Sequence, residues 1–293
     1  MTAIKFGAST FIWTSPFSND TLDLIDKVAG AGFDLIEICV EDPATINTKA
    51  INKRLLHTGI GALVCGAFGP DRDVSSDDPS IRANGIDYIN ICSDIAAELG
   101  APAVAGPMYS ATGKTAAVSA EKRAEQWKWA SENLAFSADH AATQHVSLAI
   151  EPLNRFETDL INTVDQGMEL VRRIGRDNVG LLLDTFHMNI EEHAIPNAIR
   201  RAAGKIFHFH SCANDRGIPG KDHLPWPEIV NSLSDAGYTG PWVIEAFNPE
   251  IKEIAKAVSL WRPLAVNQDA IAYDGLKLMK SVTSDAITGD KII

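Results

Sequence analysis

The chain has 293 residues and a formal net charge of −12. Phosphate backbones are held by Lys and Arg, so this acidic balance argues against a nucleic-acid partner. The sequence shows no run of ~18 apolar residues that could span a membrane and no basic-then-apolar signal segment, so we expect a cytoplasmic protein. Its four cysteines are scattered without a CxxC pair, which argues against a zinc knuckle or a disulfide framework.

Short apolar runs alternate with helical patterns along the chain. Continuous runs of Val, Ile and Leu are typical of parallel strands that are buried on both faces. We expect strands at residues 4–9, 35–39, 62–66, 101–106, 146–151, 179–184, 206–210 and 242–245. Helical patterns, several closed by a glycine suited to a left-handed C-cap, cover residues 21–32, 49–59, 79–100, 120–143, 164–175, about 190–204, and 227–237.

This alternation predicts right-handed βαβ units and a parallel sheet. Eight units in under 300 residues favour a closed (β/α)₈ TIM barrel, and α/β barrels of ~250 residues are routinely one domain. We therefore expect one barrel domain over residues 1–293. Residues from about 265 to 283 continue a helical pattern past the eighth strand. We interpret them as a C-terminal helical extension that packs on the barrel or on a partner subunit.

The last four predicted strands each end on a residue that can bind a metal. These residues are Glu151, Asp184, His210 and Glu245. Sites in this barrel are built at the carboxyl ends of the strands, so the four side chains are expected to hold one ion. Three carboxylates and one imidazole favour Mn²⁺, Mg²⁺ or Co²⁺ over structural zinc. The alternative is that these carboxylates cap the following helices or are solvated.

His208 precedes His210 by two residues and therefore points to the same side of its strand. It would face the barrel interior one layer deeper, as a core histidine or as a support for a metal ligand. Because the proposed ligands come from the last four strands, we expect the ion off-centre, with its open side toward the first four. About two positions of an octahedral ion would remain for substrate oxygens.

Three segments carry a family resemblance: EPLNRFE at residues 151–157, LDTFHMNIEE at residues 183–192, and His208-Phe209-His210. They resemble the ketose 3-epimerases, which include the D-tagatose, D-allulose (D-psicose) and L-ribulose 3-epimerases of the xylose-isomerase-like barrel superfamily. The resemblance runs from about residue 4 to beyond the Trp261-Arg262 pair. The NRFE and DTFHMNIEE stretches are specific to this family within the superfamily.

This resemblance implies a divalent metal, usually Mn²⁺, on the four strand-end residues. It also implies that three further residues hold the substrate end that bears O1 and O2, and that the protein is a homodimer or homotetramer. The implied substrate-binding residues are Glu157, His187 and Arg216.

These site residues could abstract a proton from a carbon atom next to a carbonyl group. Chelation of O2 and O3 of an open ketose would polarise C2=O and stabilise a cis-enediolate. Inversion of C3 needs a proton removed from one face and returned to the other, and Glu151 and Glu245 are the expected acid/base pair. The expected activity is metal-dependent 3-epimerisation of free ketohexoses or ketopentoses of the D-tagatose, D-allulose, D-fructose and L-ribulose type.

The half of the site that would contact the far end of the sugar departs from better-known members. Several of those carry an aromatic residue where Ser9 stands, a tryptophan in the loop where this chain reads PMYSATG (107–113), and a proline where Ala246 stands. Two alternatives stay open: a ketose–aldose isomerase of the same superfamily, or an inert sugar-binding barrel stabilised by an ion. The related multi-zinc DNA-repair endonucleases need more histidine ligands and a basic surface, and this chain has neither.

Overall fold

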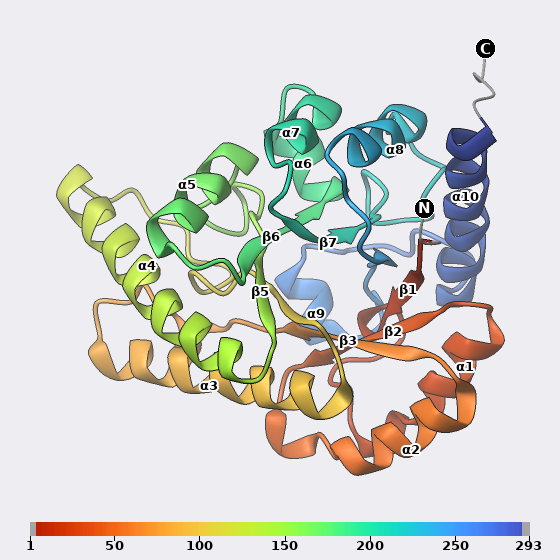
Figure 1. The fold of residues 1–293 in the computed structure, drawn as a ribbon, viewed down its shortest axis with the longest axis horizontal. Helices are drawn as coiled ribbons and strands as arrows, with labels where there is room; N and C mark the ends of the chain where they lie inside the picture. The colour runs from red at the N-terminus through yellow and green to blue at the C-terminus, as the bar shows by residue number, and fades with distance from the viewer. Residues whose placement is uncertain (1–3, 289–293) are drawn as a thin grey trace.

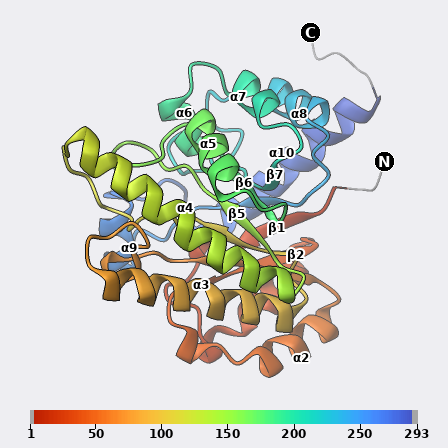
Figure 2. The same cartoon turned by 60° about the vertical axis from the view of Figure 1, so that its left-hand side comes forward.

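The computed structural model describes residues 4–288, in which eight parallel strands close into a barrel in chain order (Figures 1 and 2). This confirms the predicted (β/α)₈ class, and each observed strand overlaps a predicted one. The predicted domain, residues 1–293, extends at both ends beyond the described residues. The strands are β1 (Phe6–Ser9), β2 (Leu35–Val40), β3 (Gly61–Gly66), β4 (Ala103–Gly106), β5 (Ser147–Ile150), β6 (Val179–Asp184), β7 (Ile206–His210) and β8 (Trp242–Ile244).

The strands are mostly apolar because both of their faces are covered. All six residues of β2 are buried, as are all six of β6. Alternate residues of β2 point into the barrel, where Leu35 packs with Leu63 of β3 and Val243 of β8 in a small cluster of their own. The intervening Ile36 and Ile38 belong to the large core between strands and helices. The barrel interior is therefore packed with side chains and leaves room for a site only at its mouth.

Helices surround the strands in both ribbon views. Their ends follow local signals: Asn47, Asp78 and Thr163 accept backbone N–H bonds at N-termini, and Gly59, Gly100 and Gly175 close C-termini in the left-handed conformation. The helices are α1 (Asp23–Gly30), α2 (Thr48–Thr58), α3 (Pro79–Leu99), α4 (Ala120–Thr143), α5 (Val164–Ile174), α6 (Thr185–Glu191), α7 (Ile195–Arg201), α8 (Trp226–Asp235), α9 (Lys252–Ala257) and α10 (Gln268–Thr288), with short 3₁₀ turns at Thr10–Ile12, Asn19–Thr21, Pro43–Thr45 and Pro70–Arg72.

The prediction of one helix over about residues 190–204 was wrong. The chain forms α6 and α7 there, separated by an extended segment in which Ala194 has φ −153°. Pro196 lies in the first turn of α7, where its missing N–H costs nothing, whereas inside a continuous helix it would break the hydrogen-bond ladder. The helix also begins earlier than expected, because the Asp184 side chain accepts the backbone N–H of Phe186 and caps α6.

The predicted C-terminal helical pattern corresponds to α10, which contacts α8, β1 and β8. Trp13 and Lys27 both donate to Asp269 at the start of α10, at 2.6 and 2.7 Å. The chain between β8 and α10 includes α9, which lies inside the ring of outer helices in Figure 1. Ala255 and Leu260 of this segment pack with Phe11, Cys39 and Cys65 near the ends of β1, β2 and β3, so the segment reaches over the barrel mouth before the chain returns to the outside.

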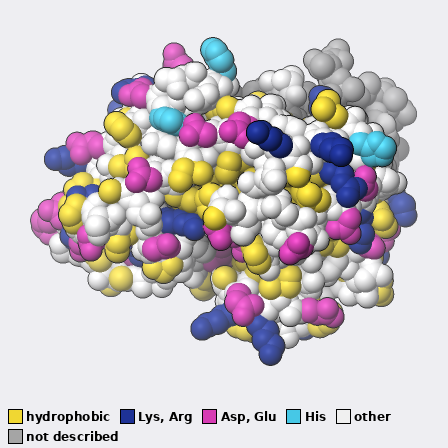
Figure 3. Space-filling view, turned by 90° about the horizontal axis from the view of Figure 1, so that it is seen from below, with side chains coloured by type: hydrophobic (Ala, Val, Ile, Leu, Met, Phe, Trp, Pro, Cys, Tyr) yellow, Lys and Arg dark blue, Asp and Glu magenta, His cyan; other side chains and the backbone are white. Residues whose placement is uncertain are grey.

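Charges of both signs share the outer surface. On the face shown in Figure 3, Lys and Arg side chains lie next to Asp and Glu side chains. Ion pairs also join neighbouring helices elsewhere, such as Arg200 to Asp235 at 2.9 Å and Arg201 to Asp165 at 2.7 Å. Exposed pairs of this kind contribute about 0–1 kcal/mol each. Among the described residues, no helix has the length and apolar character needed to cross a membrane.

Candidate active site

Four buried side chains converge at the carboxyl ends of β5 to β8. Glu151 directly follows β5, Asp184 and His210 are the last residues of β6 and β7, and Glu245 directly follows β8. One possible ligand atom from each of the four lies within 4.8 Å of the others. His210 Nδ1 is 3.7 Å from Asp184 Oδ2 and 3.7 Å from Glu245 Oε2. The structure thus brings together the four residues predicted to bind a metal.

The electrostatics of this group favour a cation. Burial raises the pKa of Glu151 well above its usual range, and the neighbouring charge of Glu245 raises it further. Burial opposes a charge on His210, but the surrounding carboxylates, Glu37 and Glu245 foremost, raise its pKa well above the usual value. Acidic groups that are buried close together repel one another and therefore bind protons more readily than in water. A divalent cation would supply the positive charge that this cluster lacks.

The donor atoms also fit such a cation. Among the described residues His210 Nδ1 is buried and has no hydrogen-bond partner, although it faces two carboxylates. Asp184 uses Oδ1 to accept the Phe186 N–H at 2.6 Å, while Oδ2 faces the cluster. The helix-capping alternative therefore holds for one oxygen of Asp184, while its other oxygen faces the cluster and accepts a hydrogen bond from the Cys212 thiol. Three carboxylates and one imidazole suit a hard divalent ion that prefers oxygen ligands.

Arg216 lies beside the cluster and connects it to Glu157. Its guanidinium is 3.2 Å from Glu157 Oε1 and 3.4 Å from Glu245 Oε2. The rings of Phe186 and Phe247 flank it, with their centroids 4.0 and 4.6 Å from the guanidinium carbon. Arg216 has φ +63°, a left-handed backbone conformation that costs a non-glycine residue free energy. This strained backbone and the flanking rings hold a buried cationic donor in one orientation.

His187 is held as a neutral donor. Its Nδ1 accepts the backbone N–H of Asn154 at 3.0 Å, so the proton of the ring lies on Nε2. Burial lowers the pKa of His187, in keeping with a neutral ring. His187 Nε2 is 3.6 Å from Glu151 Oε1 and so points at the cluster. The Asn154 side chain also donates to Glu157 Oε1 at 2.8 Å, so this one residue orients both His187 and Glu157.

A cavity of about 340 Å³ opens above the cluster. Its size falls within the range of roughly 300–1,000 Å³ that is usual for small-molecule sites. Its lining is part polar and part apolar. The polar part is formed by Glu151, Glu157, His187, Arg216 and Glu245, and the apolar part includes Phe11, Phe68, Pro107, Phe247, Ile254 and Val258.

All seven predicted site residues therefore lie at the barrel mouth. Five of them line the cavity directly, and Asp184 and His210 complete the cluster at its base. This placement agrees with the three substrate-binding residues that the sequence resemblance implied, while their roles stay predictions.

The sequence analysis missed three residues that support the site. Asn154 stands in the NRFE stretch, and its amide signalled a hydrogen-bonding role. Cys212 follows β7 and donates to Asp184 Oδ2 at 3.0 Å, which no sequence pattern indicated. Glu37 is fully buried in the middle of β2 and lies 2.6 Å from His208. A lone charge inside an apolar strand was a usable signal, because buried charges are almost always paired.

Comparison with known proteins defines the class first. The model of the family described as "Xylose isomerase-like TIM barrel" matches residues 25–281, so the chain belongs to that family. An L-ribulose 3-epimerase of Mesorhizobium japonicum is 34% identical over 271 residues, which cover 92% of this chain and 90% of the relative. Within the class, the chain is therefore a ketose 3-epimerase family member, and its relatives are enzymes of the isomerase class.

Solved structures agree with this placement. The structure of an L-ribulose 3-epimerase matches with a TM-score of 0.92 at 31% identity and covers 98% of this chain and 97% of that one. A D-allulose 3-epimerase from Methylomonas sp. in complex with D-allulose matches with a TM-score of 0.88 at 28% identity, covering 95% and 96% of the two chains. The sequence-based recognition of the family is thus confirmed.

Proposed function

We propose that this protein is a metal-dependent ketose 3-epimerase that inverts C3 of free ketohexoses or ketopentoses. The observation that carries the proposal is the position of Glu151 and Glu245. Both carboxyls belong to the four-residue cluster, and both also line the cavity, where they can reach a bound sugar. The related L-ribulose and D-allulose 3-epimerases support ketoses of these two sizes as substrates.

Glu151, Asp184, His210 and Glu245 would hold the cation, with Mn²⁺ as the first choice and Co²⁺ or Mg²⁺ as alternatives. When bound, such an ion supplies a Lewis acid that polarises the ketose carbonyl and offsets negative charge on its oxygens. The four side chains already lie within reach of one another, and no hydrogen-bond partner occupies His210 Nδ1 in the part of the chain that the structure describes. Little rearrangement of the protein is needed to bind it.

Proton transfer at C3 is assigned to Glu151 and Glu245. One carboxylate removes the C3 proton on its face of the sugar, and the carboxylic acid on the other face returns a proton to C3. Burial and the neighbouring charge of Glu245 raise the pKa of the Glu151 carboxyl, which supports its assignment to proton transfer. An acid and a base that act in turn need one protonated and one ionised carboxyl in each half of the reaction.

Glu157, His187 and Arg216 are assigned to the sugar end that bears O1 and O2. His187 offers an Nε2–H donor and Arg216 a guanidinium, while Glu157 accepts. Fixed donors near the carbonyl orient the reacting carbon without needing to bind the ion. The far end of the sugar would then lie against the apolar part of the cavity lining. A homodimer or homotetramer and a cytoplasmic location complete the proposal.

Product analysis tests this proposal. The protein, stripped of metal and reloaded with Mn²⁺, is incubated with D-fructose, D-tagatose and L-ribulose in turn, and the products are assigned by ¹³C NMR. A ketose inverted at C3 is expected, with no product from the metal-free sample. An aldose product would instead show a ketose–aldose isomerase, and unchanged sugars across the panel would show an inert binding barrel.

A further inference from the structure

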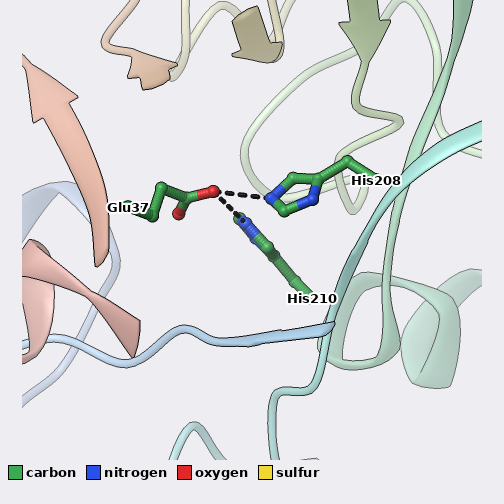
Figure 4. Close-up of side chains that lie close together, drawn as sticks. All are labelled: Glu37, His208 and His210. Atoms are coloured by element: carbon green, nitrogen blue, oxygen red, sulfur yellow. Dashed lines mark hydrogen bonds and ion pairs between the residues drawn. The ribbon is translucent and has the colours of Figure 1, made fainter. Parts of the chain in front are cut away.

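A fully buried carboxylate lies beneath the candidate metal cluster and contacts two histidines. Glu37 stands in the middle of β2, and His208 and His210 stand on β7, across the barrel. Figure 4 shows both imidazoles converging on the same carboxylate oxygen. Glu37 Oε2 is 2.6 Å from His208 Nε2 and 3.1 Å from His210 Nε2. All three side chains are buried.

Such a carboxylate is retained only if its charge is compensated. Moving a carboxylate out of water costs several kcal/mol unless hydrogen bonds and opposite charge offset it. Glu37 Oε2 lies within hydrogen-bond distance of one ring nitrogen of each histidine, and a carboxylate oxygen can accept from both. Glu37 is therefore the acceptor of two imidazole N–H groups.

The acceptor role of Glu37 decides how His210 faces the cluster. Because Nε2 of His210 carries the proton that Glu37 accepts, Nδ1 is the nitrogen left for a cation. His210 Nδ1 is also the atom that lies 3.7 Å from Asp184 Oδ2 and from Glu245 Oε2. A hydrogen bond from the second ring nitrogen commonly fixes the orientation of a metal-binding histidine.

We propose that Glu37 is a positioning residue that holds His210 with Nδ1 toward the cation. His208 braces Glu37 by the shorter of its two hydrogen bonds and keeps the carboxylate from turning away. This inference rests on the metal site of the proposed function. It assigns a task to two residues that contact neither the cavity nor the proposed ligand cluster, except through His210.

Two substitutions distinguish the effect of the hydrogen bond from the effect of side-chain packing. Glu37→Gln keeps an oxygen that can accept the imidazole N–H groups, whereas Glu37→Leu removes the acceptor. Asp73→Asn is the matched control, since Asp73 is a buried carboxylate paired with Lys114 at 2.6 Å and lies outside the cluster. Metal affinity is measured by calorimetry with Mn²⁺. The His210 Nε2–H resonance is followed by ¹⁵N NMR with diamagnetic Mg²⁺ and without metal.

We expect Glu37→Leu to weaken metal binding by about 10- to 100-fold, the usual effect of losing such a support. Glu37→Gln should recover most of this loss and keep the protected Nε2–H resonance that Glu37→Leu loses. Asp73→Asn should lower the melting temperature without changing metal affinity. A purely structural role for Glu37 would lower the melting temperature of both Glu37 variants and leave metal affinity unchanged.

Unchanged metal affinity in Glu37→Leu, or a free Nε2 on His210 in the wild-type protein, would overturn the inference. Binding of two ions per chain, the second lost in Glu37→Gln, would also overturn it, because Glu37 would then be a ligand. The resonance in the metal-free protein tests the geometry even if the wild type binds no ion. Absence of epimerase activity in protein that binds metal would defeat the proposed function and leave this inference standing.

Discussion

The two halves of the barrel mouth differ in kind. Strands β5 to β8 end on Glu151, Asp184, His210 and Glu245, whereas the cavity on the side of β1, β3 and β4 is lined by Phe11, Phe68 and Pro107. Charged groups need fixed partners when buried, so the first half is tied together by hydrogen bonds and ion pairs. The apolar half needs no such partners, and only its shape must match that of the bound ligand. From this difference we expect the polar half to carry the reaction chemistry and the apolar half to carry the sugar preference.

The largest effect is expected at the two glutamates. Replacing Glu151 or Glu245 by Gln keeps an oxygen ligand but removes the basic carboxylate, so kcat should fall by at least ~10²-fold. Metal content, measured by elemental analysis, should fall much less than kcat. Near-wild-type epimerisation in both variants would show that the polar half does not transfer the proton.

A smaller loss is expected where the polar half positions the sugar. Hydrogen bonds contribute about 0.5–1.5 kcal/mol each, and more when one partner is charged. Arg216→Ala or His187→Ala should therefore lower kcat/KM by about tenfold or more with nearly unchanged metal affinity. The exposed Arg155, which pairs with Glu191, provides the control, since Arg155→Ala should leave both quantities close to wild type. Release of the metal by Arg216→Ala, with turnover restored at saturating metal, would instead place Arg216 among the ligands.

The pH dependence of stability should differ between the metal-free and metal-loaded protein. In the metal-free protein the pKa values of Glu151 and His210 are raised, so both groups stabilise the fold when protonated. That contribution to stability is lost gradually as the pH rises from about 5 to 8 and above. Asp184 and Glu37 have lowered pKa values and lose their contribution only below about pH 5. The lowered pKa values of His187 and His208 act in the opposite direction and add stability as pH rises toward about 7. The fall in the metal-free melting temperature should therefore be clearest above about pH 7.

Metal binding should reverse this trend, because the ion displaces protons from its ligands and binds more tightly at higher pH. An ion present at 100 times its Kd raises stability by about 2.7 kcal/mol. Thermal melts at several pH values, with and without Mn²⁺, measure the gain. A metal-induced shift that shrinks as pH rises from 5 to 8 would contradict the assignment of these ligands.

The smallest effect is expected in the apolar half. Ile254 of α9 lines the cavity, and Ile254→Ala removes apolar surface against the far end of the sugar. At about 0.8 kcal/mol per buried methylene, KM should rise by roughly fourfold or more with little change in kcat. Val266→Ala, at an exposed position in the same segment after β8, is the control. A large fall in kcat for Ile254→Ala would break the division between the two halves.

Much of the fold could be predicted because its signals are local. Apolar runs and glycine C-caps located all eight strands and most helices, while Pro196 marked the break between α6 and α7 that the prediction overlooked. Strand-end residues of the site were predictable because barrel geometry gathers strand ends. Contacts across the barrel, such as Glu37 to His210, were not, since 173 residues separate the partners. Nor does the sequence pattern show that Asn154 orients His187.

The most direct test of the account is the fate of the C3 hydrogen in D₂O. Wild-type protein with Mn²⁺ should place deuterium at C3 of both epimers, as read by ¹H NMR of the sugar. If Glu151 and Glu245 serve opposite faces, one Gln variant should still exchange the C3 hydrogen of one epimer, and the other variant that of its partner epimer. Epimerisation by the wild type without deuterium at C3, or identical exchange patterns in the two variants, would contradict the account.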